Sequence, residues 1–147
     1  GGILIIMAMA MGFTMYLTIQ EVPQKLFEII HQYISSKLVF LLLLNIFLII
    51  VGCMMDIFSA ILVVVPIILP VAKDFGIHPI HLGIIFLANL EIGYLTPPVG
   101  LNLFMSSFRF QKSIISIYKA AVPFIILLLL GLLLITYIPE LSLLFIQ

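Results

Sequence analysis

Charge is the property that this sequence has least of. Only 8% of its 147 residues are Asp, Glu, Lys or Arg, and six basic residues balance six acidic ones. A soluble globular domain is usually about a quarter charged, so a water-soluble fold of this size would not find enough polar surface to cover itself. The zero net charge also removes the bulk attraction on which nucleic-acid binding depends, and we expect no nucleic-acid partner.

Cysteine and catalytic groupings are scarce as well. Cys53 is the one cysteine and lies in an apolar run, which excludes a disulfide framework. No nucleophile–base pair, metal-ligand cluster or phosphate-binding loop stands out, so the sequence predicts neither an enzyme nor an organic cofactor. The chain opens on Gly1-Gly2 and an apolar run, without the basic leader of a signal peptide. We interpret this start as lying inside a membrane segment of a longer protein.

Hydrophobic residues, by contrast, make up 65% of the chain, against about half in a soluble domain. This excess predicts an all-α integral membrane protein. Residues 1–20 carry no charge and suffice for one helix across a core of about 30 Å at about 1.5 Å per residue. Residues 120–139 form an uncharged last membrane helix. Residues 21–37 predict an amphipathic helix on the membrane surface, with an apolar face of Val22, Leu26, Ile29, Ile30, Tyr33 and Ile34.

Residues 38–72 hold two short apolar stretches that meet at a polar junction. Asp56 is the only charge between Lys37 and Lys73, and Gly52 and Ser59 lie close to it. This pattern predicts a re-entrant helical hairpin, although two full membrane spans are a competing interpretation. Asp56 is suited to cap the helix that follows it, but a carboxylate within the membrane is costly and favours a functional role as well.

Residues 79–108 predict a discontinuous helix. Its only charge is Glu91, for which we weigh a buried ion pair evenly against a coupling role. A continuous helix between Asp74 and Arg109 would reach about 50 Å, too long for one straight span. Pro97 and Pro98 lie inside residues 93–100, which begin and end with glycine, so the break is expected there. Two adjacent prolines exceed what a simple kink needs, and they favour a binding site.

The hairpin junction and the helix break together indicate a transport site. Discontinuous helices expose helix N-termini to anions, and their unwound carbonyls can hold a sodium ion. The side chains that can add oxygen ligands are those of Asp56, Ser59, Thr96 and Asn102.

At these residues the sequence resembles the large membrane permease of tripartite ATP-independent periplasmic (TRAP) transporters. The resemblance covers nearly the whole chain and includes Gly52 to Pro70, Gly76 to Gly83 and Asn89 to Phe104; its most specific part is the run Thr-Pro-Pro-Val-Gly-Leu-Asn from Thr96 to Asn102. It implies an elevator-type fold of two inverted repeats, of which this chain would be the second, C-terminal one. The hairpin and broken helix of the first repeat are missing, so a complete substrate site is not expected from these residues alone.

The resemblance also implies a function, a location and partners. The function is sodium-driven import of a small organic anion, such as a dicarboxylate or a sialic acid, across the inner membrane of a bacterium or archaeon. The expected partners are a small membrane subunit, a periplasmic binding protein and the lipid bilayer. Sodium is the expected coupling ion, and the positions carried over as sodium ligands are Gly52, Asp56, Gly93, Thr96 and Gly100. The positions expected to face the substrate or to couple it to sodium are Ser59, Glu91, Pro97, Pro98 and Asn102.

The basic residues predict the orientation. Arg109, Lys112 and Lys119 have no acidic residue among them, so this segment should be cytoplasmic and the C-terminus outside. Charge counting alone prefers residues 20–37 on the inside, but the resemblance favours the outside, which we adopt. Two other functions remain open. One is a related sodium/carboxylate symporter that needs no binding protein; the other is a structural membrane protein, in which the helix break would have no role.

Overall fold

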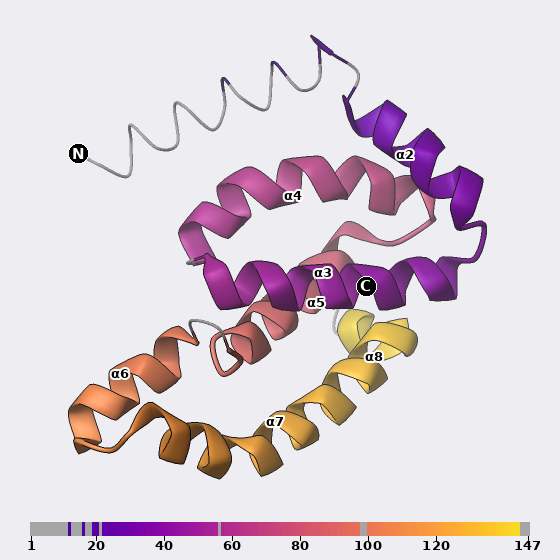
Figure 1. The fold of residues 1–147 in the computed structure, drawn as a ribbon. Helices are drawn as coiled ribbons and strands as arrows, with labels where there is room; N and C mark the ends of the chain where they lie inside the picture. Colours follow the sequence, from indigo (N-terminus) through magenta and orange to yellow (C-terminus); the bar gives the residue numbers. More distant parts are fainter. Residues whose placement is uncertain are drawn as a thin grey trace.

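The computed structural model describes Gly12, Tyr16 and residues 19–20, 22–55, 57–97 and 100–144. Every regular element within these ranges is a helix (Figure 1). The prediction of an all-α fold is therefore confirmed for the described residues. The expected helix over residues 1–20 falls almost wholly outside the described residues, as do Asp56 and Pro98.

Helix α2 (Val22–Tyr33) is the amphipathic segment. Lys25 and Glu28 are exposed on it, while Ile30 and the following Ile34 pack against the core. Ile29 and Tyr33, which the sequence placed on the same apolar face, are exposed. The helix rests on α4, so only part of its apolar face is used within the described part of the chain.

Helices α3 (Lys37–Met54) and α4 (Ile57–Asp74) form an antiparallel hairpin (Figure 1). At its open end, Lys37 Nζ donates a hydrogen bond to the Gly76 carbonyl over 3.1 Å, and the Phe40 and Phe75 rings stack with centroids 4.2 Å apart. Helix α4 continues through Pro66 and Pro70.

Helix α5 (Pro79–Gly93) lies against α3 along most of its length. It begins with a proline, which suits the first helical position because no backbone donor is needed there. The His78 side chain caps this end, since its Nδ1 accepts a hydrogen bond from the Ile80 N–H. Helix α6 (Leu101–Phe110) follows after the irregular segment that contains Thr96 and Gly100. α5 and α6 are thus separate helices.

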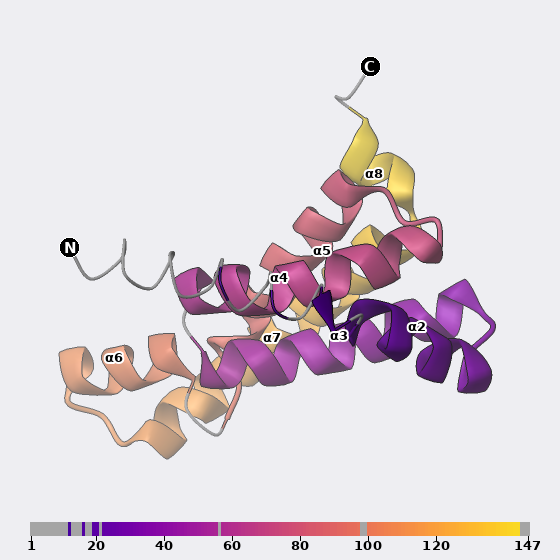
Figure 2. The ribbon, with the colours of Figure 1, turned by 90° about the horizontal axis from the view of Figure 1, so that it is seen from above.

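Helix α7 (Ile114–Tyr137) begins at Ile114 rather than at Ala120, where the uncharged run starts. The Ser113 side chain explains the earlier start. Its hydroxyl accepts a hydrogen bond from the Ser116 N–H and so satisfies a free backbone donor of the first turn. Helix α7 contacts α6, and it also contacts α5 and the short α8 (Pro139–Leu143). In both ribbon views α6 and the first turns of α7 extend beyond the closed end of the α3–α4 hairpin (Figure 1, Figure 2).

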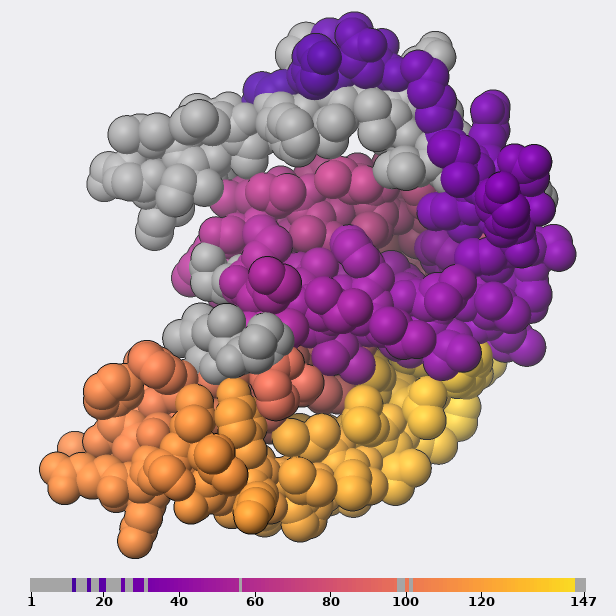
Figure 3. Space-filling model, in the orientation of Figure 1, coloured from indigo at the N-terminus to yellow at the C-terminus, as the bar shows by residue number. Residues whose placement is uncertain are grey.

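The core lies between α3, α4 and α5, and it includes Leu48, Ala60, Ile85 and Leu90, each at most 1% exposed. Outside it, apolar side chains dominate the surface; on α7, for example, Phe124 and Leu127 are 66% and 67% exposed. Figure 3 shows α7 at the surface along one edge of the molecule. Helices α3, α4 and α7 are long and apolar enough to cross a membrane, and α5 is a shorter apolar helix. Their exposed faces are suited to lipid or to further membrane-embedded protein.

Candidate ion site at the hairpin tip and the helix break

The tip of the hairpin and the break after α5 meet at two glycines. A Cβ atom added to Gly93 would lie 2.6 Å from the Gly52 Cα, and one added to Gly52 would lie 2.8 Å from the Leu90 Cα. Both glycines are buried. The two regions that the sequence marked separately therefore lie against each other, and Gly52 and Gly93 form the contact between their backbones.

The backbone of the break turns tightly from Gly93 onward. The Thr96 N–H donates to the Gly93 carbonyl over 2.9 Å, and the Thr96 hydroxyl donates to the Ile92 carbonyl over 2.7 Å. Across the break, the Asn102 N–H donates to the Tyr94 carbonyl over 3.2 Å. Because the Thr96 hydroxyl donates its proton within the turn, its oxygen keeps lone pairs with which to accept or to coordinate.

Gly100 completes the break in a left-handed conformation, with φ of 53°. A Cβ atom there would lie 3.1 Å from the Thr96 carbonyl oxygen. The backbone angle favours glycine, and a side chain here would also have to displace the neighbouring Thr96 carbonyl slightly. Gly100 therefore shapes the break and keeps a small space open beside the Thr96 carbonyl.

The other predicted site residues that the structure describes differ in exposure. Ser59 is half-buried near the start of α4, whereas the side chains of Glu91, Pro97 and Asn102 are exposed. Of the predicted set, the described residues that the structure brings together are Gly52 with Gly93, and Thr96 with Gly100.

A buried polar cluster, which the sequence did not predict, joins three helices near this site. Asn45 on α3 donates to the Thr136 hydroxyl on α7 over 3.0 Å, and Asn89 on α5 donates to the Asn45 Oδ1 over 2.7 Å. All three side chains are at most 4% exposed. Asn89 is four residues before Gly93, so the cluster fixes α5 against α3 one turn from the break. In the sequence, Asn45 and Asn89 are isolated amides within apolar runs. Only the fold shows that their side chains meet.

His81 connects α5 to both α7 and α8. Its Nε2 lies 3.2 Å from the Thr136 carbonyl oxygen, and its Nδ1 lies 2.9 Å from the Ser142 hydroxyl. Within the described residues no group of three or more His, Cys, Asp or Glu is placed to hold a metal ion. His81 therefore acts as an interhelical contact between α5, α7 and the segment containing α8.

Tyr118 was also missed, because it lies in the segment 109–119, which attracted notice only for its basic residues. Its hydroxyl oxygen is buried, has no hydrogen-bond partner among the described residues, and lies 3.4 Å from the Cβ position of Gly100. Helix α7 thus brings the Tyr118 hydroxyl close to the break.

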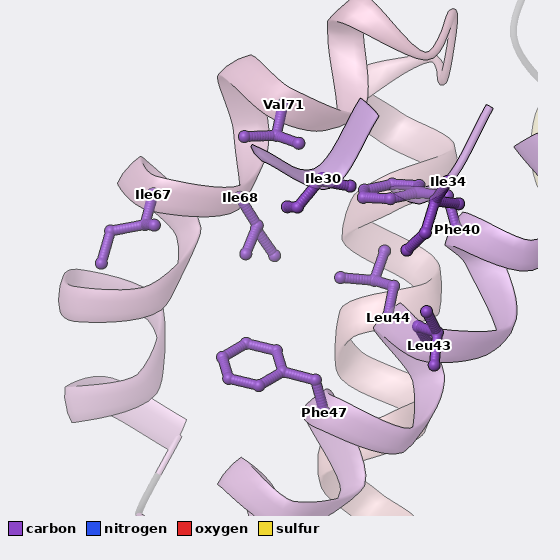
Figure 4. Close-up of a pocket in the computed structure, with 9 residues that line it drawn as sticks. All are labelled: Ile30, Ile34, Phe40, Leu43, Leu44, Phe47, Ile67, Ile68 and Val71. Atoms are coloured by element: carbon purple, nitrogen blue, oxygen red, sulfur yellow. The ribbon is translucent and has the colours of Figure 1, made fainter. Parts of the chain in front are cut away.

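An apolar cavity of about 330 Å³ separates the two arms of the hairpin (Figure 4). Its side chains come from α3, α4 and the region of α2 that adjoins them, and none of them is polar. A carboxylate or a cation would lose its water there without gaining a partner. The described lining therefore does not suit an ion or a carboxylate. It consists of Ile30, Ile34, Phe40, Leu43, Leu44, Phe47, Ile67, Ile68 and Val71.

Comparison with known proteins gives the family. The sequence model described as "Tripartite ATP-independent periplasmic transporter, DctM component" matches residues 1–141. The chain belongs to this family. The resemblance to TRAP large permeases is thereby confirmed, and this TRAP permease chain is a multi-pass protein of the inner membrane.

Curated relatives place the chain among permeases with different named substrates. It is 43% identical, over 96% of its length, to a C4-dicarboxylate TRAP transporter large permease of Pseudomonas aeruginosa. It is 38% identical, over 97% of its length, to an isethionate TRAP transporter permease of Oleidesulfovibrio alaskensis, and 32% identical, over 95%, to a sialic acid TRAP transporter large permease of Vibrio cholerae. The matched regions are 33%, 22% and 34% of those proteins, so the chain spans about a third or less of their length.

Proposed function

We propose that this chain forms the second, C-terminal repeat of a sodium-coupled permease that imports a small organic anion. The observation that carries the proposal is the contact between Gly52 and Gly93, because it joins a hairpin tip to a helix break within membrane-embedded helices. Such junctions provide unwound carbonyls for sodium and helix N-termini for anions. Sodium would be held by carbonyl and side-chain oxygens of residues 52–56 and 93–100, including those of Asp56 and Thr96.

In this proposal α3 and α4 form a re-entrant hairpin, and α5 and α6 form one interrupted span of an elevator-type fold. The extension of α6 and α7 beyond the closed end of the hairpin favours this arrangement over two full spans (Figure 1, Figure 2). We further propose that Ser59, Glu91, Pro97, Pro98 and Asn102, which lie near the tip or the break in the sequence, face the substrate or couple it to sodium. The missing first repeat would supply the other half of the substrate site.

The partners follow from family membership. We propose a periplasmic binding protein that delivers the anion and a small membrane subunit that supports the permease. The names of the relatives make dicarboxylates, isethionate and sialic acids the first substrates to test. From the positive-inside rule we further propose that Arg109, Lys112 and Lys119 lie in the cytoplasm and the C-terminus outside.

Reconstitution of the full-length permease with its small subunit in liposomes tests this function. Uptake of radiolabelled succinate, isethionate and sialic acid is measured with and without the periplasmic binding protein, under an inward sodium or potassium gradient. We expect uptake of one of these anions, only with sodium and only with the binding protein. Sodium-driven uptake without the binding protein would favour a self-sufficient symporter, and equal uptake in potassium would contradict sodium coupling.

A further inference from the structure

The hydroxyl of Tyr118 points at the helix break from a different helix. Tyr118 belongs to the second turn of α7, and its hydroxyl oxygen is fully buried although the residue as a whole is half-buried. Among the described residues no donor or acceptor pairs with this oxygen. A buried hydroxyl without a partner costs about 1–3 kcal/mol, so packing alone would favour phenylalanine at this position.

The other tyrosine of α7 shows the contrast. The Tyr137 hydroxyl, at the opposite end of the helix, donates to the Leu38 carbonyl over 3.1 Å and so has a structural partner. Tyr118 has the same chemistry without such a partner, and its oxygen lies at the break. The two residues therefore differ in what their hydroxyls bind.

The space in front of the Tyr118 hydroxyl is defined by Gly100. The position that a Gly100 Cβ would take is 3.4 Å from the Tyr118 oxygen and 3.1 Å from the Thr96 carbonyl oxygen. Two oxygen atoms from separate segments thus lie close to the side of Gly100 on which a side chain would otherwise stand. The Thr96 carbonyl oxygen has only lone pairs to offer, and the Tyr118 hydroxyl can rotate its hydrogen away and offer lone pairs too. Together they can present negative charge to a cation.

We propose that Tyr118 supplies a ligand oxygen to the sodium ion bound at the break, together with the Thr96 carbonyl. This inference rests on the proposed function and extends the site to α7. The site then has contributions from the hairpin, the broken helix and α7. Sodium binding satisfies the Tyr118 oxygen and links α7 to the break, so that α7 responds to the occupancy of the site.

Tyr118→Phe removes one oxygen atom and keeps the ring, and Tyr137→Phe is the matched control on the same helix. Both variants are made in the full-length transporter. For each, we measure the sodium concentration that gives half-maximal uptake in liposomes, and the thermal midpoint in detergent with saturating sodium or with potassium only. Tyr118→Phe should raise the half-maximal sodium concentration roughly tenfold, since 1.4 kcal/mol of lost ion binding corresponds to a factor of ten.

The thermal midpoints separate a ligand from a structural contact. Tyr118→Phe should leave the midpoint in potassium unchanged or higher and should reduce the stabilisation by sodium. Tyr137→Phe should lower the midpoint equally in both salts and leave the sodium dependence of uptake as in the wild type. The inference is overturned if Tyr118→Phe lowers both midpoints equally with unchanged sodium dependence, or if the variant fails to assemble, because the hydroxyl is then structural. If uptake by the wild-type transporter does not depend on sodium, the proposed function is overturned, and this inference with it.

Discussion

Gly93 of α5 lies backbone to backbone against Gly52 of α3, so that a Cβ atom on Gly93 would fall 2.6 Å from the Gly52 Cα. Small residues allow membrane helices to approach closely and to pack without a hydrophobic driving force. Here the close approach occurs where one helix reaches the hairpin tip and the other reaches its break. The contact fixes the end of α3 relative to the break that follows α5. The proposed ion site requires these two segments to lie together.

A methyl group at this contact should therefore be costly. Gly93→Ala should destabilise the transporter by about 1–3 kcal/mol, as expected for overpacking against backbone that has no side chain to move aside. The measurement is the thermal midpoint of the full-length transporter in detergent.

Gly83 on the same helix is the matched control, since nothing lies within 4 Å of the position of its Cβ. Gly83→Ala should be neutral or stabilising by up to about 1 kcal/mol, because alanine favours helix over glycine. Equal effects of Gly83→Ala and Gly93→Ala would mean that the α3–α5 contact is looser than described.

The buried amides should be coupled energetically. Asn45→Leu and Asn89→Leu each break the 2.7 Å hydrogen bond between the two side chains, so the double variant should lose less stability than the sum of the single variants. We expect a coupling of about 1 kcal/mol, in the range of hydrogen bonds between membrane helices, from a double-mutant cycle of unfolding in mixed detergent. A cycle of Asn45 with Asn102, whose side chain is exposed on α6, should give no coupling. Zero coupling between Asn45 and Asn89 would show that the cluster is not a unit.

The orientation predicts which end of the chain reagents can reach. In a Cys53→Ser background, a cysteine placed after Leu144 should react with a membrane-impermeant reagent from outside intact cells. The reason is that the proposed orientation puts the basic residues 109–119 in the cytoplasm and lets α7 cross once. Labelling only after the membrane is opened would reverse the topology.

Asp56 lies at the hairpin tip in the sequence but outside the described residues. Asp56→Asn keeps a side chain that can cap the following helix and removes only the charge. We expect normal membrane insertion and a weaker sodium dependence of uptake, because a carboxylate in the membrane stabilises a bound cation. Unchanged sodium dependence would limit Asp56 to capping.

Much of the fold could be predicted because rare charges and paired prolines mark the ends of apolar helices. The sequence located the helix break through Pro97 and Pro98, and the structure ends α5 at Gly93 and begins α6 at Leu101. It did not reveal the start of α7, which depends on a cap from Ser113 that hydropathy does not register.

The assembly of the site was not predictable in the same way. The contact of Gly52 with Gly93 and the approach of Tyr118 to Gly100 both join segments that are distant in the sequence. Nothing in the residues around Tyr118 indicates which distant segment its hydroxyl approaches. Patterns along the chain therefore marked the parts of the site, while only packing between helices shows how they combine.

In the proposed function the break leaves carbonyls free to bind sodium, and replacing both Pro97 and Pro98 with alanine tests this role. Alanine favours helix over proline by about 3 kcal/mol at each interior position, so the helix should close and use those carbonyls in its own hydrogen bonds. We predict that the full-length variant inserts normally, is at least as stable as the wild type without sodium, and loses sodium-driven uptake in liposomes. Reduced stability with full sodium-driven uptake would contradict the account, because the break would then be architectural and the ion site would lie elsewhere.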